Sequence, residues 1–438
     1  MSKITLFIAV MSLLCFKGLH AQPAAQQTLT IEKMFELADL NSKSIRPATT
    51  GIAEAGEAVK EAKNARLPEI DVTLSGSFLG NGCLIERDLS HGMKAPMPHW
   101  GNNFAVEVSQ IIYSGGAVSN TIALSKLQQE NARLNLLKDK NKLHFLVTGY
   151  YLDLYKQRNL LQVYNRNIAL TRKVLDDIRA KNSEGIVLKN DITRYELLLA
   201  NLELARTQIN NTLRILNQNL VTTLGLPEGT EIMPDTTLLK SSYPKDNSAY
   251  WENTASTNSP ELKQLELAVK MSRHQEKIAK SDLLPKIALT AANHFDGPIT
   301  IEVPPIDQNF NYWYVGIGLK YNLSSLFKTP KSVKKQKFAT QRTKEQFADA
   351  CEQVELAVKA DYIRYLEAYE KLKTQEKSVE LANQNYDVVY NRYANELALI
   401  TDMLDASNSK LLAETELANA QINIIYNYYK LRYLTGTL

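Results

Sequence analysis

Two acidic residues near the end of the chain have a spacing that could support chemistry. Asp402 and Asp405 are three residues apart, so on a helix both carboxylates lie on one face. A carboxylate pair of this kind can attract a cation, as the acidic side chains of ion-channel filters do. The alternative is structural. Asp402 would then cap the start of a helix, and Asp405 would lie in its first turn, where the helix dipole favours an acid.

Other reactive residues show no arrangement typical of catalysis. Gly316 and Gly318 lack the third glycine and the strand–helix context of a dinucleotide-binding loop. The histidines after residue 21 fall singly along the chain, without the spacing of metal ligands; they are His91, His99, His144, His274 and His294. We identify neither a phosphate-binding loop nor a Ser/His/Asp arrangement. We therefore expect no enzyme activity, no cofactor and no metal.

The composition limits the fold class and the partners. Among 438 residues there are only 18 glycines and 14 prolines, below the average usage of roughly 7% and 5%. This scarcity of turn residues disfavours an all-β fold. With 44% hydrophobic and 22% charged residues the chain should not be disordered. A net charge of +4 is too small to indicate nucleic-acid binding.

The N-terminus has the pattern of a secretory signal peptide. Lys3 precedes an apolar run over residues 4–16, and the small residue Ala21 stands before Gln22. Residues 1–21 are therefore expected to be removed on export. The remaining chain holds no stretch of 18 uncharged apolar residues, so a transmembrane helix is not expected.

The chain contains an internal repeat. Segments of 28 residues that start at Asn41 and Asn258 align without a gap, and each ends in Leu-Pro, at Pro68 and Pro285. Each half then follows the order helix, strand, loop, strand, long helix, turn, helix. We therefore expect a mainly α protein with a small β part. The expected divisions are a signal peptide at 1–21, a first structural repeat at 22–226, an inter-repeat segment at 227–258 and a second repeat at 259–438.

Four strands are expected from alternating apolar residues, over about 68–79, 103–113, 285–294 and 312–323. With roughly ten residues each, they could cross a bilayer as tilted strands. The alternative is a soluble four-stranded sheet. Four strands are too few to close a membrane barrel, so a spanning role requires several chains. The lipid-facing positions would then be Phe104, Val106, Val108, Val315, Ile317 and Leu319.

Seven-residue repeats of apolar side chains predict long coiled-coil helices. A helix is expected over Ala117–Ser183, as part of a helical hairpin over about 117–224, and a second hairpin over about 330–434. The first helix of the chain is expected over Ile31–Arg66. The repeating positions in the two hairpins are Val147, Leu154, Leu161, Ile168 and Leu175, and Cys351, Val358, Tyr365, Leu372, Val379, Tyr386 and Tyr393.

Taken together, these features resemble the TolC-type outer-membrane efflux proteins. The resemblance rests on the signal peptide, the duplicated unit, the two Leu-Pro pairs, the strand exit Ile112-Tyr-Ser-Gly-Gly116 and the turn from Arg392 to Ala406. It covers residues 22–438. It implies a homotrimer, with a twelve-stranded β-barrel in the outer membrane on a twelve-helix α-barrel in the periplasm. Residues 227–258 and the C-terminal end would belong to an equatorial domain around the helices.

The resemblance also assigns roles to the helical turns. In a trimer, Asp402 and Asp405 would form two stacked carboxylate rings at a periplasmic aperture, and Asp191 and Tyr393 would hold neighbouring hairpins closed. A family member used for comparison has an arginine at the position of Ala398, so that salt link is absent or replaced here. The turns that would contact a periplasmic adaptor protein comprise Gly185, Ile186, Val187, Leu397, Ala398 and Leu399.

Three functions follow from these features. The first is the passive exit duct of a tripartite efflux pump, which works with a periplasmic adaptor and an inner-membrane RND or ABC transporter. The second is the outer-membrane exit of a type I protein secretion system. The third, of another class, is an exported coiled-coil structural protein without a pore. Nothing in the sequence separates efflux from secretion.

Two clusters of side chains have alternative interpretations. Tyr312, Trp313, Tyr314 and Tyr321 could form an aromatic girdle at the membrane interface or could pack at the extracellular rim. Lysines concentrate where the last strand becomes a long helix, either at a solvated helix start or in contact with lipid phosphates; they are Lys328, Lys331, Lys334, Lys335 and Lys337.

Overall fold

The computed structural model describes residues 26–235, 238, 243–244, 246–302 and 304–438. The predicted signal peptide, residues 1–21, lies outside the described residues. The chain forms two compact units. The first comprises Met1–Ile45, Lys140–Ala255 and Ala357–Leu438, and the second comprises Arg46–Asp139 and Ser256–Leu356. Each unit therefore draws segments from both expected sequence repeats.

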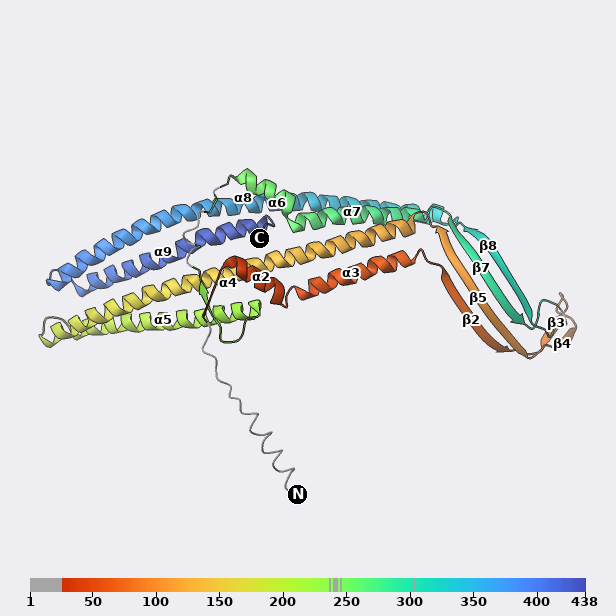
Figure 1. Ribbon diagram of the computed structural model, residues 1–438, viewed down its shortest axis with the longest axis horizontal. Coiled ribbons are helices and arrows are strands. Elements are labelled where there is room, and N and C mark those ends of the chain that lie inside the picture. The colour runs from red at the N-terminus through yellow and green to blue at the C-terminus, as the bar shows by residue number, and fades with distance from the viewer. Residues whose placement is uncertain (1–25, 236–237, 239–242, 245, 303) are drawn as a thin grey trace, which may run out of the picture. The chain divides into compact units, whose positions relative to one another are not determined.

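The second unit contains a four-stranded antiparallel sheet in the order β2-β5-β7-β8 (Figure 1). The strands are β2 (Glu69–Phe78), β5 (Trp100–Tyr113), β7 (Lys286–Gly297) and β8 (Phe310–Lys320). β2 and β5 form one hairpin and β7 and β8 the other, and β5 pairs with β7. β2 and β8 each pair on one side only, so both are edge strands.

The two faces of this sheet differ in polarity. Side chains directly opposite each other in a ladder lie on the same face. The pairing of Val72 with Val106, and of Ala291 with Val315, therefore groups apolar residues on one face. The other face carries polar and small residues, among them Asp71, Thr73, Glu107, His294, Thr290 and Gly316.

Each strand of the sheet has a helix next to it in the chain. The helices α3 (Arg46–Asn64) and α7 (Pro260–Ser281) precede β2 and β7, and the first parts of the long helices α4 (Ala117–Ser183) and α8 (Ser325–Ala394) follow β5 and β8. Between β5 and α4 the chain turns at Gly115, which has a φ of +64°. A Cβ there would meet the Ser281 carbonyl oxygen at 2.5 Å. The glycine of this strand exit is thus required both by its backbone angle and by the close approach of α7.

The first unit consists mainly of two helical hairpins. The later part of α4 pairs with α5 (Lys189–Leu224), and the later part of α8 pairs with α9 (Ile400–Leu434) (Figure 1). α4 has the bounds that the sequence predicted. All twelve predicted heptad positions in the two long helices are buried or half-buried, so the coiled-coil periodicity describes the packed faces correctly.

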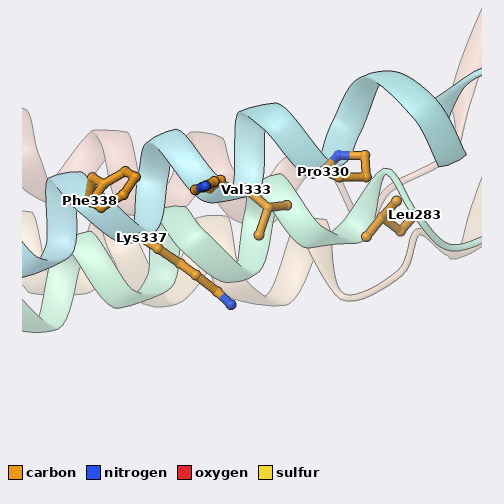
Figure 2. A pocket seen from close by; sticks show the side chains of 6 residues that line it. Leu283, Pro330, Val333, Lys337 and Phe338 are labelled. Carbon is orange, nitrogen blue, oxygen red and sulfur yellow. The ribbon is translucent and has the colours of Figure 1, made fainter.

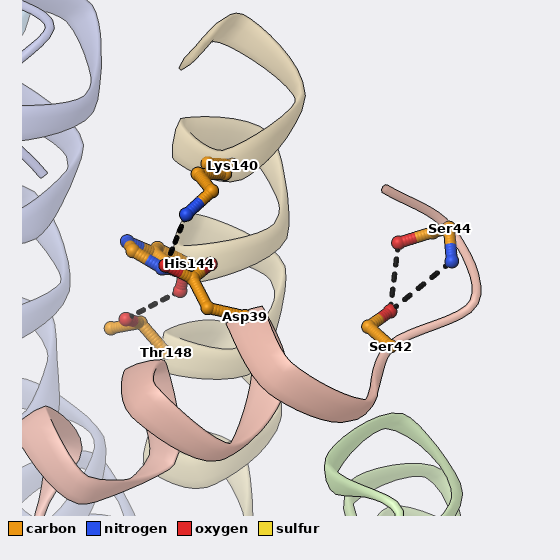
Figure 3. A network of polar contacts seen from close by, with 6 residues as sticks. All are labelled: Asp39, Ser42, Ser44, Lys140, His144 and Thr148. Carbon is orange, nitrogen blue, oxygen red and sulfur yellow. Dashed lines mark hydrogen bonds and ion pairs between the residues drawn. The ribbon is translucent and has the colours of Figure 1, made fainter. Parts of the chain in front are cut away.

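Smaller elements join the hairpins of this unit. β1 (Gln26–Leu29) pairs in parallel with β6 (Glu231–Pro234), and α2 (Ile31–Asn41) and α6 (Ser248–Asn258) pack on the long helices. Asp39 of α2 accepts from Lys140 Nζ at 2.8 Å and lies 3.1 Å from His144 Nε2 on α4 (Figure 3). The tyrosines near the C-terminus pack against Phe145, Tyr243 and Trp251.

The structure corrects several sequence expectations. The helix expected over Ile31–Arg66 is broken into α2 and α3, because Pro47 has no N–H with which to continue an α-helix across residues 42–45. β8 ends at Lys320 and not at 323, since the Asn322 side chain and carbonyl accept from Ser324 and Ser325 and form a turn. α8 accordingly starts at Ser325, five residues before Pro330.

Strands β1, β3 (Gly82–Ile85), β4 (Gly92–Ala95) and β6 were not expected from the sequence. β3 and β4 form a separate hairpin within the connection between β2 and β5. The aromatic residues with two possible interpretations lie on both faces of the sheet. Tyr312 and Tyr314 stack on His294 on the polar face of the sheet, whereas Trp313 shares the apolar face with Val106.

Candidate functional site

The turns of the two helical hairpins have the same backbone structure. In the first turn, the N–H of Gly185 donates to the Asn182 carbonyl and that of Ile186 to the Lys181 carbonyl, both at 3.0 Å. The second turn repeats these bonds from Glu396 and Leu397 to the carbonyls of Tyr393 and Arg392, at 3.1 and 2.7 Å. This is the Schellman arrangement, which requires a left-handed residue after the helix.

The residue in the left-handed position differs between the turns. Gly185 has a φ of +77° and Glu396 a φ of +61°. Glycine adopts this conformation freely, whereas a residue with a Cβ pays roughly 1–2 kcal/mol. The second turn is therefore strained where the first is not. Gly185 and Glu396 each stand six residues before an aspartate, Asp191 and Asp402, but periodicity gave no sign that a glutamate would occupy a glycine conformation.

Asp191 and Asp402 have the same role at the start of the return helices. Each is the third residue of its helix, and its Oδ2 accepts from the backbone N–H three residues before, at 3.1 Å from Leu188 and 3.0 Å from Leu399. The carboxylate thereby satisfies an N–H that has no partner within the helix. The structural interpretation of Asp402, as a residue that caps α9, is thus present in the structure.

Asp405 differs from Asp402 although both are exposed. Asp405 makes no hydrogen bond or ion pair with any residue that the structure describes. Its carboxylate is therefore available to an outside cation, whereas that of Asp402 is already engaged. The equivalent position in the first turn is Arg194, so only the second turn offers two acidic side chains on one helix face.

A buried apolar cluster holds the ends of the two hairpins together. Met403 and Ile178 are fully buried, and Tyr195 is almost so. The cluster is made of Val174, Leu175, Ile178, Tyr195, Tyr386, Tyr393, Ile400, Met403 and Ala406. Val187 and Ala398, two of the predicted adaptor-contacting residues, pack against this cluster. Ala398 therefore fills an apolar position, and it cannot form the salt link of the compared family member.

Tyr393 lies inside this cluster, close to the charge of Asp191. Lys181 lies over its ring, with Nζ 4.6 Å from the centroid, and donates to its carbonyl at 3.3 Å. Its hydroxyl is buried and makes no hydrogen bond to the described residues. Burial, followed by the negative charges of Asp191 and Asp177, raises the pKa of Tyr393. The structure therefore brings Asp191 and Tyr393 near each other, but without a hydrogen bond between them.

The other predicted tip residues are mostly exposed. Ile186, Leu397 and Leu399 are exposed apolar side chains, and so is Leu188, the equivalent of Leu399. Each turn thus presents apolar side chains outward from an otherwise polar helix end. Such exposed apolar groups are typical of protein contact surfaces. Leu188 was missed by the sequence prediction, although its correspondence with Leu399 could have identified it.

A second candidate surface is the apolar face of the sheet. The six predicted lipid-facing residues all lie on this one face by their pairing register, and Ile70, Val72 and Leu74 extend it across β2. Ile317 is 73% exposed and Leu74 is 79% exposed, far above what a water-facing strand usually shows for such residues. The apolar side chains are exposed on the edge strands β2 and β8, whereas Val106 and Val108 on β5 are half-buried.

Among the described residues, no helix combines the length and apolar character that crossing a bilayer demands. Within the same residues, no three His, Cys, Asp or Glu side chains come together as metal ligands.

Comparison with known proteins finds similarity to outer-membrane efflux proteins. The sequence model of the family described as outer membrane efflux protein matches residues 251–437. Outer membrane protein TolC of Salmonella enteritidis is 21% identical over 428 residues, which cover 94% of this chain and 83% of the relative. Outer membrane efflux protein BepC of Brucella suis is 21% identical over 440 residues, which cover 98% of this chain and 90% of BepC.

Solved structures show the same fold. The crystal structure of CusC, described with its transmembrane channel formation, aligns with a TM-score of 0.78 at 14% identity and covers 93% of this chain and 92% of that one. The predicted resemblance to TolC-type outer-membrane efflux proteins is thus confirmed by the family model, the relatives and the fold. The similar proteins are outer-membrane channels and not enzymes.

Proposed function

We propose that the protein is an outer-membrane channel that serves as the passive exit duct of a tripartite efflux pump. The observation that carries this proposal is the four-stranded sheet, which has one broad apolar face, one polar face and two unpaired edges. In a bilayer, the apolar face would contact lipid and the polar face would contact water. The proposed location is the outer membrane, with the helical hairpins in the periplasm and the signal peptide directing export.

The unpaired edges support a trimer. Unsatisfied backbone groups are not tolerated in lipid, so β8 of one chain would pair with β2 of the next. Three chains would close a twelve-stranded barrel. The hairpins support the same assembly, because α5 exposes Leu197 and Leu204 and α8 exposes Leu381 and Val388. Within each pair the two residues are seven positions apart in the sequence. Both pairs lie at similar distances from the turns, as expected for a coiled-coil seam between neighbouring chains.

The gate is proposed at the hairpin turns. Three copies of Asp405 would form a carboxylate ring, with the Asp402 carboxylates beside it, at the narrow periplasmic end. Closure would rest on the buried cluster around Met403 and Tyr393, since Ala398 cannot supply a salt link. The exposed apolar residues of the turns would dock on a periplasmic adaptor protein, which joins the duct to an inner-membrane RND or ABC transporter.

Two other functions make different predictions. A type I protein secretion exit would use the same channel with another motor, and no residue described above favours it over efflux. An exported coiled-coil protein without a pore is disfavoured, because a structural rod has no need for an exposed apolar sheet face with 73% exposed Ile317.

The proposal is tested by the assembly and conductance of the purified full-length protein. We expect heat-resistant trimers in outer-membrane fractions and steady conductance in planar lipid bilayers. Monomers without conductance would contradict the proposal and favour the rod. A knockout strain would then separate the two channel functions. Raised sensitivity to drugs and bile acids with normal protein secretion indicates efflux, and the opposite pattern indicates secretion.

A further inference from the structure

The start of α8 carries an unusually strong positive charge. From residue 308 to residue 344 the chain has eight basic side chains and no acidic one. Five of the lysines lie within ten residues immediately after the sheet, and each is exposed. They are Lys328, Lys331, Lys334, Lys335 and Lys337. None of the five makes an ion pair within the part of the chain that the structure describes.

The packing of α8 on α7 leaves these charges unmatched. The two helices meet through uncharged hydrogen bonds, at 3.1 Å between Gln336 and Gln275 and at 2.8 Å between Thr340 and Ser272. The acidic residues near this end of α7 are paired elsewhere, Glu276 with Lys280 and Asp282 with Lys286. No neighbouring acid of α7 therefore compensates the lysines.

Apolar surface lies directly beside the lysines. A groove of about 510 Å³ is lined by Leu283, Pro330, Val333, Lys334, Lys337 and Phe338. Figure 2 shows Leu283 beyond the end of α7, next to Pro330, while the Lys337 ammonium extends away from α8. Phe327 is 83% exposed and Phe338 is 65% exposed. Leu323 and Leu326, which lie in the chain between β8 and this groove, are exposed as well.

We propose that this groove binds an anionic glycerophospholipid of the inner leaflet of the outer membrane. The phosphate would lie among Lys331, Lys334 and Lys337, and the upper part of an acyl chain would lie against Phe338 and Val333. Such a ligand combines the two properties of the site, because it carries a negative headgroup on an apolar chain. The inference rests on the proposed function, since it requires the sheet to lie in the membrane.

A second copy of the chain is a poorer occupant. Pairing of β8 with β2 of a neighbouring chain would bring the start of α8 beside the end of that chain's α3, because α3 leads into β2 and α8 follows β8. That end carries Lys63 and Arg66 together with Glu61 and Glu69, so it has no surplus of acid with which to neutralise the five lysines.

The test uses the purified full-length trimer, titrated with phosphatidylglycerol or phosphatidylcholine and analysed by native mass spectrometry. The variant is Lys331→Gln with Lys334→Gln and Lys337→Gln. The matched control is Lys138→Gln with Lys142→Gln and Lys373→Gln, which removes the same charge from exposed positions without ion pairs among the described residues. Near a membrane surface each lysine contributes about fivefold to binding of an acidic lipid, so the variant should bind phosphatidylglycerol at least tenfold more weakly, whereas the control should match the wild type.

Phe338→Ala keeps the lysines and removes the apolar wall. It should weaken phosphatidylglycerol and phosphatidylcholine alike, because contact with an acyl chain does not depend on the headgroup. Equal binding of phosphatidylglycerol by wild type, lysine variant and control would overturn the inference. So would loss of the trimer in the lysine variant without any lipid, which would assign the groove to a chain–chain contact. Conductance of the wild type in neutral bilayers is measured in parallel. If the wild type does not conduct, the proposed channel is refuted. If it conducts but binds phosphatidylglycerol no better than phosphatidylcholine, only the lipid site is refuted.

Discussion

The two hairpin turns share a backbone but differ in what their side chains can do. Both end the long helix with the same pair of hydrogen bonds and begin the return helix with an aspartate that accepts from a leucine N–H. The first turn has an unstrained glycine and a basic residue, Arg194, after this aspartate. The second has a strained Glu396 and the unpaired acid Asp405. The shared features therefore serve folding, and those found only in the second turn are candidates for function.

The largest difference between the turns should appear in the buried cluster. Met403 is fully buried, whereas Ile192, its equivalent in the first turn, is only partly buried. Met403→Ala should destabilise the packed turns by about 2–5 kcal/mol, since it leaves a cavity, and Ile192→Ala should cost clearly less. Amide hydrogen exchange at both turns of the full-length protein measures this. Equal effects, or a larger effect at Ile192, would show that the cluster is not centred on the second turn.

Substitution of the left-handed residue should have the next largest effect on the stability of each turn, and the sign of this effect should differ between the two turns. Gly185→Ala should destabilise the first turn by about 1–2 kcal/mol, because alanine in the left-handed region is strained. Glu396→Gly should relieve that strain in the second turn and leave it equally or more stable. Proteolysis at each turn, compared with the wild type, reports these changes. A loss of stability in Glu396→Gly would mean that the glutamate makes a stabilising contact in the assembly.

The aspartates that begin the return helices should have equal effects. Asp191→Ala and Asp402→Ala each remove one carboxylate that accepts from an N–H and lies at the positive end of a helix, at a cost of about 0.5–1 kcal/mol. Local hydrogen exchange in the first turn of α5 and of α9 compares the two directly. If Asp402→Ala were much more damaging than Asp191→Ala, its carboxylate would have a role beyond the helix end.

The hydroxyl of Tyr393 should have the smallest effect at neutral pH. It is buried without a hydrogen bond among the described residues, so Tyr393→Phe should leave the closed turns unchanged or slightly more stable. Folding raises the pKa of Tyr393, so the folded state favours the neutral phenol. The stability that this difference contributes is fully present below the pKa of free tyrosine, about 10, and is lost as the pH rises through the higher folded pKa. Tyr393→Phe should reduce this alkaline loss, measured by hydrogen exchange at several pH values. Opening of the channel by Tyr393→Phe at pH 7 would instead indicate that the hydroxyl holds the gate closed.

The features predicted well from the sequence are those set by local periodicity. The heptads gave the long helices and their packed faces, and the alternation in β5 and β8 gave one apolar sheet face. Contacts between distant segments could not be predicted in this way. The pairing of Gln26 with Glu231 joins residues far apart in the chain, and the end of β8 depends on a turn made by the Asn322 side chain. The spacing of Asp402 and Asp405 was equally compatible with capping and with cation binding. The difference between them is visible only in the structure, where the Asp402 carboxylate accepts from the Leu399 N–H and the Asp405 carboxylate has no partner among the described residues.

Block of the conducting trimer by a multivalent cation tests the proposed gate most directly. Hexamminecobalt(III) is added on the periplasmic side of planar bilayers that hold the wild type, Asp405→Asn, Asp402→Asn with Asp405→Asn, or the matched control Asp191→Asn. We expect block of the wild type and of the control, strong relief in Asp405→Asn, and complete loss of block in the double variant, because the Asp405 carboxylates are the ones left free to bind the cation. Unchanged block in the double variant would contradict a carboxylate aperture at the second turn.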